Sequence, residues 1–334
     1  MKSKIIEATN LTKVYNRKVT AVNHISFSVA EGELFGFLGP NGAGKTTTIK
    51  LLTTLATITS GEATVAGRDV GKDPSAVRKA IGIVPQELMA DDELKGVENL
   101  LLSAKLHHVP SDKARKKAQK LLELLELEGA AQRQVKTYSG GMRRRLQLAM
   151  GLIHDPQILF LDEPTLGLDV QTRQNMWNHI RGLNRDEGIT VFMTTHYLEE
   201  ADSLCDRIAI IDGGVIKTSG TPTELKSGLG GNVLTLQLTN GAAVTGVSQL
   251  LRSVPDVTDV VREGSTYRIK LTRTEQALPA IVEAVSKNKL KISDISLTKP
   301  TLDQVFLQIT GDNMREGPTT ADGFGQRVLI ERLK

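Results

Sequence analysis

The segment from Gly39 to Thr47 has the residue types and spacing of a loop that binds a chain of phosphates. Its glycines let the backbone curl so that successive N–H groups point at a phosphate, and the positive end of the predicted helix that follows adds to this attraction. Lys45 can neutralise the terminal phosphates, and the Thr46 hydroxyl can bind Mg²⁺. The segment fits the pattern G-x-x-x-x-G-K-[ST] between a predicted strand and a predicted helix, and its residues are Gly39, Pro40, Asn41, Gly42, Ala43, Gly44, Lys45, Thr46 and Thr47.

Two adjacent acidic residues supply chemistry that this loop lacks. Asp162 and Glu163 end the run Ile158–Glu163 (ILFLDE), whose apolar part is typical of a strand buried on both faces of a parallel sheet. A carboxylate at the end of such a strand can hold Mg²⁺. Its neighbour can polarise an attacking water as a general base. We therefore interpret Asp162 as a metal ligand and Glu163 as the base.

A second helix start suited to anions lies far downstream, at Ser139, Gly140 and Gly141. Serine offers a hydroxyl, the glycines allow close approach of the backbone, and the start of a helix favours negative charge. Three arginines follow at residues 143–145, and we interpret them as the exposed side of this helix. Because no aromatic stacking platform accompanies them, we do not expect nucleic acid as a partner.

The elements that must position these residues alternate between strands and helices, which predicts an α/β core. Residues 4–15 and 24–32 have the alternation of half-exposed antiparallel strands. The residue pattern from about 87 to 155 is typical of helices, and one predicted helix in this segment ends at Gly129. Further strands are predicted at 158–162 and 190–196, and a hairpin at 207–220.

The pattern restarts after a glycine-rich joint at residues 227–232. The predicted order is βαββαβ followed by one more helix, which suggests a small ferredoxin-like α+β domain. We place a first domain at 1–229, a C-terminal regulatory or dimer-supporting domain at 230–311 and a polar tail at 312–334.

The amino-acid composition indicates the class of protein but does not identify a binding partner. The 334 residues are 40% hydrophobic and 24% charged, which is typical of a globular chain. The net charge of +4 is compatible with an anionic membrane surface or with nucleic acid. The one cysteine, Cys205, excludes an internal disulfide and fits a reducing compartment. We expect no membrane-spanning helix, because no apolar run approaches about 20 residues.

The order of the motifs resembles that of ATP-binding subunits of ABC transporters. The phosphate loop, YSGGM, ILFLDEP, LGLD and TTH follow one another with the family's spacing over about residues 4–225. The resemblance implies a P-loop NTPase (RecA-like) core with an antiparallel β subdomain and a helical subdomain, and it implies ATP with Mg²⁺. It also implies that two such domains pack head to tail, so that Ser139, Gly140 and Gly141 contact the ATP held by the other domain. The segment departs from the common form LSGGQ at Tyr138 and Met142.

Four more site residues follow from the resemblance alone. Gln86 corresponds to the glutamine that reaches Mg²⁺ and the attacking water. His196 corresponds to the histidine that touches the γ-phosphate, and Asp169 to the aspartate that communicates across the dimer. Tyr15 corresponds to the aromatic residue that stacks on adenine.

The resemblance implies an ATPase that powers a separate integral membrane permease from the cytoplasmic side of the cell membrane. The segment 87–154 would dock that permease. The C-terminal domain, which ends in PTLDQVFLQITG, is similar to that of the drug-export branch with ABC-2 permeases. The alternative is a soluble ABC-type ATPase that acts on ribosomes or DNA, although such proteins usually carry two nucleotide domains or a long coiled coil. A non-hydrolysing regulator is disfavoured by Glu163 and His196. Homodimer or heterodimer stays open, as does the transported molecule.

Overall fold

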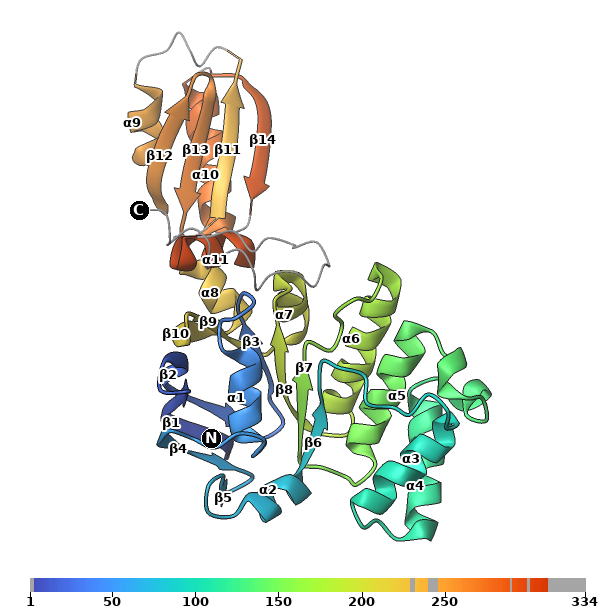
Figure 1. The fold of residues 1–334 in the computed structure, drawn as a ribbon. Coiled ribbons are helices and arrows are strands. Elements are labelled where there is room, and N and C mark those ends of the chain that lie inside the picture. The colour runs from blue at the N-terminus through green and yellow to red at the C-terminus, as the bar shows by residue number, and fades with distance from the viewer. Residues whose placement is uncertain (1–2, 229–231, 240–245, 289, 299–300, 312–334) are drawn as a thin grey trace, which may run out of the picture.

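The structure, a computed structural model, describes residues 3–228, 232–239, 246–288, 290–298 and 301–311. These residues form three sheets with helices packed around them (Figure 1). The central sheet has the order β10-β9-β3-β8-β7-β6, and all its neighbours pair in parallel except β10 and β9. Its strands are β3 (Leu34–Leu38), β6 (Ile81–Val84), β7 (Ile158–Asp162), β8 (Thr190–Thr195), β9 (Arg207–Asp212) and β10 (Val215–Gly220).

An antiparallel sheet covers one face of the central sheet. It has the order β2-β1-β4-β5, with β1 at Lys4–Tyr15, β2 at Val19–Ala30, β4 at Ser60–Val65 and β5 at Arg68–Asp69. The core between the two sheets includes residues of α1 (Lys45–Leu52) and Val77 of α2 (Pro74–Ala80). The shared core contains Phe35 and Phe37, which alternate along β3 with residues of the opposite face. This arrangement confirms the predicted antiparallel subdomain.

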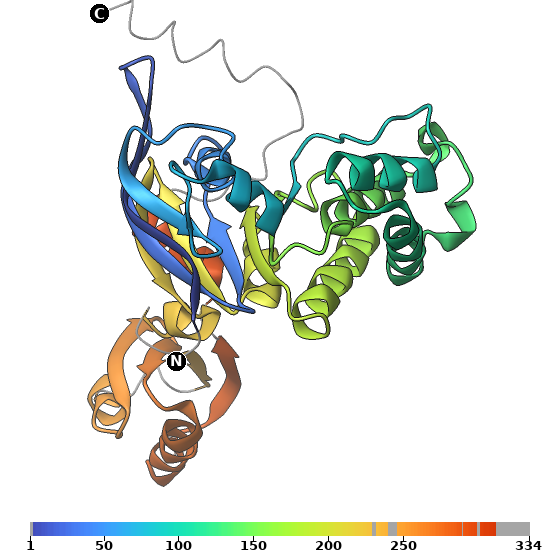
Figure 2. The same cartoon turned by 90° about the horizontal axis from the view of Figure 1, so that it is seen from below.

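Helices cover the other face, where Leu34 and Leu38 of β3 enter a second core. They are α3 (Gly96–Leu106), α4 (Ser111–Leu124), α5 (Gly140–Leu152), α6 (Val170–Arg185) and α7 (Leu198–Leu204), with short 3₁₀ turns at Glu128–Ala130 and Val135–Thr137. Figure 2 shows α3, α4 and α5 grouped to one side of the sheets. The predicted helical subdomain is therefore present. The predicted helix end at Gly129 is wrong: α4 ends at Leu124, and Glu126 has a positive φ of 54° that turns the chain away.

The C-terminal elements form a separate sheet with its own core. The order β12-β13-β11-β14, antiparallel throughout, is that of a ferredoxin-like domain and confirms this part of the predicted fold. The elements are β11 (Asn232–Leu238), α9 (Val247–Arg252), β12 (Val257–Glu263), β13 (Thr266–Leu271), α10 (Thr274–Lys287) and β14 (Ile292–Thr298). Tyr267 and Ile281 are buried where the helices pack on this sheet.

The last described helix, α11 (Leu302–Thr310), packs elsewhere. Its buried residues Leu302, Val305 and Phe306 belong to the core of the first domain, together with residues of α7 and of α8 (Pro222–Ser227). Figure 1 shows α11 between the ferredoxin-like sheet and these two helices. The predicted domain boundary at 229–230, within the glycine-rich joint, and the predicted tail at 312–334 lie outside the described residues.

None of the described helices combines the length and the apolar character needed to span a bilayer.

Candidate nucleotide site

The segment from Gly39 to Thr47 runs from the end of β3 into the first turn of α1, as the sequence predicts. Gly44 precedes α1 with φ at +105°, and a Cβ atom there would lie 2.4 Å from the Ala21 carbonyl oxygen. Only glycine fits such a position, because it has no side chain to collide and tolerates positive φ. The Lys45 ammonium is folded back over the loop, donating to the carbonyl oxygens of Gly39 at 2.8 Å and Pro40 at 3.1 Å.

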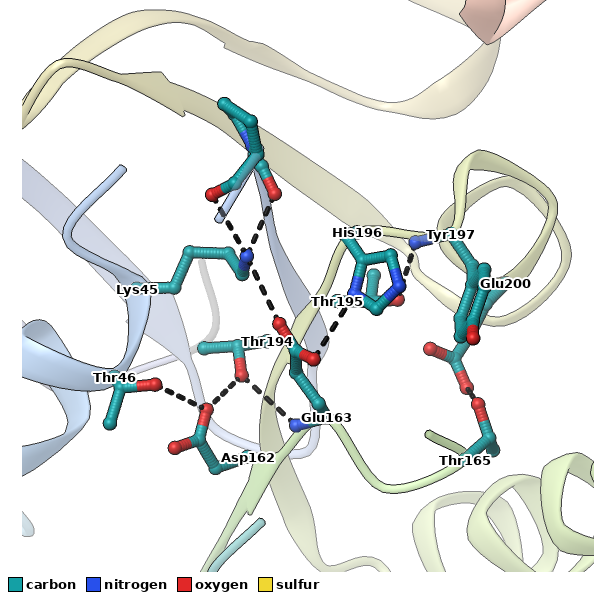
Figure 3. A network of polar contacts seen from close by, with 12 residues as sticks. Lys45, Thr46, Asp162, Glu163, Thr165, Thr194, Thr195, His196, Tyr197 and Glu200 are labelled. Carbon is teal, nitrogen blue, oxygen red and sulfur yellow. Dashed lines mark hydrogen bonds and ion pairs between the residues drawn. The ribbon is translucent and has the colours of Figure 1, made fainter. Parts of the chain in front are cut away.

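Asp162 is the last residue of β7 and Glu163 follows it, both beside the phosphate loop (Figure 3). Asp162 Oδ1 accepts hydrogen bonds from the Thr46 hydroxyl at 3.1 Å and from the Thr194 hydroxyl at 2.5 Å. The Glu163 N–H donates to the carbonyl and hydroxyl oxygens of Thr194, each at 3.1 Å. Thr194 at the end of β8 therefore fixes both acids.

Glu163 lies between two basic side chains. Its Oε1 is 3.1 Å from Lys45 Nζ, and its Oε2 is 3.1 Å from Nδ1 of His196. Nδ1 of His196 makes no hydrogen bond of regular geometry, so this second contact is a close approach of the two side chains. Burial raises the pKa of the Glu163 carboxyl, but the contact with His196 and the charge of Lys45 outweigh burial and hold the pKa below its ordinary value. The ionised form, which a general base requires, is therefore favoured.

Ser139 caps α5, since its hydroxyl oxygen accepts from the Met142 N–H at 3.3 Å. Gly140 has open space where a side chain would be, whereas a Cβ on Gly141 would lie 2.4 Å from Cγ2 of Thr172. Asp169 caps α6 and holds the same threonine, accepting from its N–H at 2.9 Å and its hydroxyl at 2.7 Å. The start of α5 thus packs directly on the turn that contains Asp169.

The predicted site residues consequently fall into two contact groups. Lys45, Thr46, Asp162, Glu163 and His196 form the first, and Ser139, Gly141 and Asp169 form the second. In both cartoon views α5 lies well to one side of α1 (Figures 1 and 2). The side chains of Tyr15, at the end of β1, and of Gln86, after β6, are exposed. The Tyr15 ring has Lys13 Nζ 5.0 Å from its centroid.

One expectation is wrong. Arg144 is not on the exposed side of α5 but is 4% exposed, with its guanidinium bonded to backbone carbonyls near Gln86 and Glu163. The apolar stripe of α5 forces this, because Leu148 and Leu152 lie four and eight residues further on and are buried. Thr194 was not predicted as a site residue, although it lies in the TTH segment, two residues before His196.

A glycine-rich loop after a parallel strand, with paired acids ending a nearby strand, defines the class of P-loop nucleoside triphosphatases. The family model described as ABC transporter matches residues 22–166, and the model described as ATP-binding protein DrrA1-3-like, C-terminal domain, matches residues 220–310.

Similar proteins carry drug-resistance names. Daunorubicin resistance ATP-binding protein DrrA3 of Streptomyces coeruleorubidus is 41% identical over 88% of this chain and 92% of its own length. Linearmycin resistance ATP-binding protein LnrL of Bacillus subtilis is 37% identical over 93% of this chain and all of its own length. Among solved structures, the ATP-binding cassette MJ0796 bound to ADP and Pi matches 65% of this chain and 98% of its own, with a TM-score of 0.60 and 26% identity.

The chain belongs to the ATP-binding subunits of ABC transporters, in the branch that contains the daunorubicin-resistance proteins. It is accordingly an ATP-binding protein and an ATPase, as the motif order predicts.

Proposed function

We propose that this chain is the ATP-hydrolysing subunit of an exporter of drugs, antibiotics or other hydrophobic compounds. The observation that carries the proposal is that similarity to drug-resistance ATP-binding proteins extends over both domains and about nine-tenths of the chain. Two copies act together with a separate integral membrane permease, on the cytoplasmic side of the cell membrane. The helical segment 87–154 docks that permease.

In this proposal the phosphate loop and Lys45 hold the phosphates of ATP, with Tyr15 stacked on the adenine. Lys45 is ready for this role because its ammonium already lies over the loop, held by two carbonyl oxygens and Glu163. Phosphate oxygens are stronger partners for an ammonium than carbonyls are, so a bound nucleotide draws Lys45 toward itself.

Thr46, Asp162 and Gln86 are the residues proposed to hold Mg²⁺. The donor set fits, because a hydroxyl and a carboxylate oxygen already lie 3.1 Å apart and Mg²⁺ prefers oxygen ligands. When bound, the ion would neutralise charge on the transferring phosphate. Glu163 takes the proton of the attacking water, and His196 steadies Glu163 and faces the γ-phosphate.

Ser139, Gly140 and Gly141 serve the ATP of the other copy, in a head-to-tail homodimer, with Asp169 at the same junction. The open space at Gly140 and the packing of Gly141 on the Asp169 turn support an exposed surface built from both motifs.

The three arginines at residues 143–145 do not support the alternative of an ATPase that acts on nucleic acid. Arg143 pairs with Asp92 at 2.7 Å, Arg145 pairs with Glu126 at 3.1 Å, and Arg144 is buried. Basic side chains engaged within the chain contribute less to a phosphate-binding surface than free ones do.

The head-to-tail pairing is tested by mixing two inactive variants, Lys45→Ala and Ser139→Arg. Each homodimer has two damaged sites, whereas the mixed dimer has one site that is intact on both sides. Labelled chains first establish that subunits exchange. Recovered ATP turnover supports the pairing, and mixed dimers that form but stay inactive contradict it.

The transport role is tested by co-expressing the chain with an integral membrane permease of the drug-export branch. Cells should export a fluorescent anthracycline when they carry the wild-type chain and retain it when they carry Glu163→Gln. Equal export by both strains would contradict the proposal.

A further inference from the structure

Arg144 joins three separate segments through its side chain. Nε donates to the Pro164 carbonyl at 2.8 Å, and one terminal nitrogen donates to the Glu163 carbonyl at 2.9 Å. The other terminal nitrogen donates to the carbonyls of Pro85 at 2.9 Å and Gln86 at 3.1 Å. A side chain of α5 therefore holds the backbone after β7 and the backbone after β6 at the same time.

A buried guanidinium makes this junction specific. Burial lowers the pKa of Arg144, while the nearby carboxylates of Asp162, Glu200 and Glu163 favour its charged form. A buried cation is tolerated only when its donors are satisfied. The planar fork of arginine reaches several carbonyls in fixed directions, which the single ammonium of lysine cannot do.

Gln147, one turn further along α5 and 2% exposed, extends the same contacts. Its Oε1 accepts from Arg144 at 2.9 Å, and its Nε2 donates to the carbonyl oxygens of Glu87 at 2.6 Å and Pro85 at 3.2 Å. The segment from Pro85 to Glu87 is thus fastened to α5 by two side chains.

Ser139 caps the start of the same helix, five residues before Arg144. An α-helix is stiff over this length, so a displacement of the carbonyls that hold Arg144 is passed to the start of α5. The carbonyls belong to or adjoin the proposed base Glu163 and the proposed metal ligand Gln86.

We propose that Arg144 is a positioning residue that couples the nucleotide site of one copy to the Ser139–Gly141 segment that the same copy offers to its partner. This inference rests on the head-to-tail pairing proposed above. Occupation of one site would then adjust the half-site contributed to the other, through the buried side chain of Arg144 with Gln147 as a second contact.

The proposal distinguishes Arg144 from its neighbours. Arg143 and Arg145 have carboxylate partners on the surface of the helical segment and do not touch the backbone at residues 85–86 or 163–164 by any described hydrogen bond. A change at Arg144 should damage both sites of a dimer, whereas a change at Glu163 or Ser139 on one copy should damage only one.

Two covalently linked dimers test this. In both, the first copy carries Arg144→Lys. In one dimer the second copy carries Lys45→Ala, so that the remaining site uses the first copy's loop and Glu163. In the other dimer the second copy carries Ser139→Arg, so that the remaining site uses the first copy's α5 start. The parent dimers without Arg144→Lys set the reference turnover.

We expect kcat to fall about 10- to 100-fold in both dimers, the size of effect that displacing a reacting group by about 1 Å produces. The KM for ATP should change little, because the contacts of the phosphate loop are untouched. Arg145→Lys in the same positions is the matched control and should stay within about twofold of the parents. The unfolding temperature of each dimer excludes a general loss of structure.

A loss confined to the first dimer would overturn the coupling and leave the head-to-tail pairing intact. No loss in either dimer would also overturn it. Parent dimers that are both silent would contradict the pairing itself, and the coupling with it. If Arg144→Lys does not fold, Gln147→Met replaces it. That variant removes only the hydrogen bonds of Gln147, and a smaller loss of kcat is then expected in both dimers.

Discussion

Lys45 Nζ and Glu163 Oε1 lie 3.1 Å apart, and both side chains are less than a tenth exposed. Each charge therefore has an opposite charge beside it, whereas an unpaired buried charge is costly. The pair also means that the residue proposed to bind phosphate and the residue proposed to activate water hold one another before ATP arrives. A bound phosphate must compete for Lys45, and Glu163 then keeps its contact with His196.

Replacing Glu163 by glutamine should separate binding from hydrolysis. Glu163→Gln keeps the size of the side chain but removes the base, so turnover should fall by roughly 10²-fold or more. ATP binding should be retained or tightened, because a neutral amide competes less for Lys45 than a carboxylate does. Equilibrium binding with Mg²⁺ and steady-state hydrolysis measure the two effects. ATP-bound dimers should accumulate and be visible by light scattering, and near wild-type turnover would remove Glu163 from the role of base.

The same pair predicts how stability changes with pH. The pKa of Glu163 is lowered in the folded chain from its ordinary value of 4.5. Its ionic contacts therefore contribute stability that is fully present above that ordinary pKa and is lost as the pH falls through the lower, folded pKa. Between pH 7 and pH 3, the nucleotide-free wild type should lose more stability than Glu163→Gln does. Chemical denaturation at each pH measures this, and parallel curves for the two chains would contradict it.

The sequence predicted the first contact group almost completely, because its residues occur in short motifs at the ends of strands. Parallel strands place their carboxyl ends at one edge, so β3, β7 and β8 must bring Lys45, Asp162 and His196 together. Arg144 was misjudged for a different reason. Three successive arginines on a helix point about 100° apart, and only the phase set by Leu148 and Leu152 shows which one is buried.

The surface on which α11 packs could not be predicted in the same way. Its sequence shows an apolar side at Leu302, Val305 and Phe306, but two surfaces were available to cover it. The ferredoxin-like sheet already buries its apolar face under α9 and α10, and the first domain offers α7 and α8. Which surface remains uncovered is a property of the folded chain and not of the segment.

The two glycines at the start of α5 should respond differently to alanine. At Gly141 a Cβ would lie 2.4 Å from Thr172 Cγ2, so Gly141→Ala should lower stability by about 1–3 kcal/mol through overpacking. Gly140→Ala meets open space and should fold normally, while reducing turnover if the partner's ATP approaches there.

The double variant Gly141→Ala with Thr172→Ser gives the control. Serine lacks Cγ2 but keeps the hydroxyl that bonds Asp169, so part of the lost stability should return. Thermal unfolding of the wild type, the single variants Gly141→Ala and Thr172→Ser, and the double variant measures the cycle. Equal stability of Gly141→Ala and Gly140→Ala would show that the close contact at Thr172 is relieved without cost.

Finally, α11 should stabilise the first domain without being needed for nucleotide binding. Phe306 is 2% exposed in the core shared with α7 and α8, whereas the next residue, Leu307, is 42% exposed. Phe306→Ala should lower the free energy of unfolding by about 3–5 kcal/mol, as such core truncations do. Leu307→Ala is the matched control and should have little effect, within about 0.5 kcal/mol.

A chain that ends at Gly228 loses the whole helix and should unfold at a lower temperature than the full chain. It should still bind ATP, because every predicted phosphate contact lies before that point. Calorimetry and ATP titration of the full chain and these three variants measure both properties. A truncated chain that folds but does not bind ATP would mean that the nucleotide site extends into the C-terminal part.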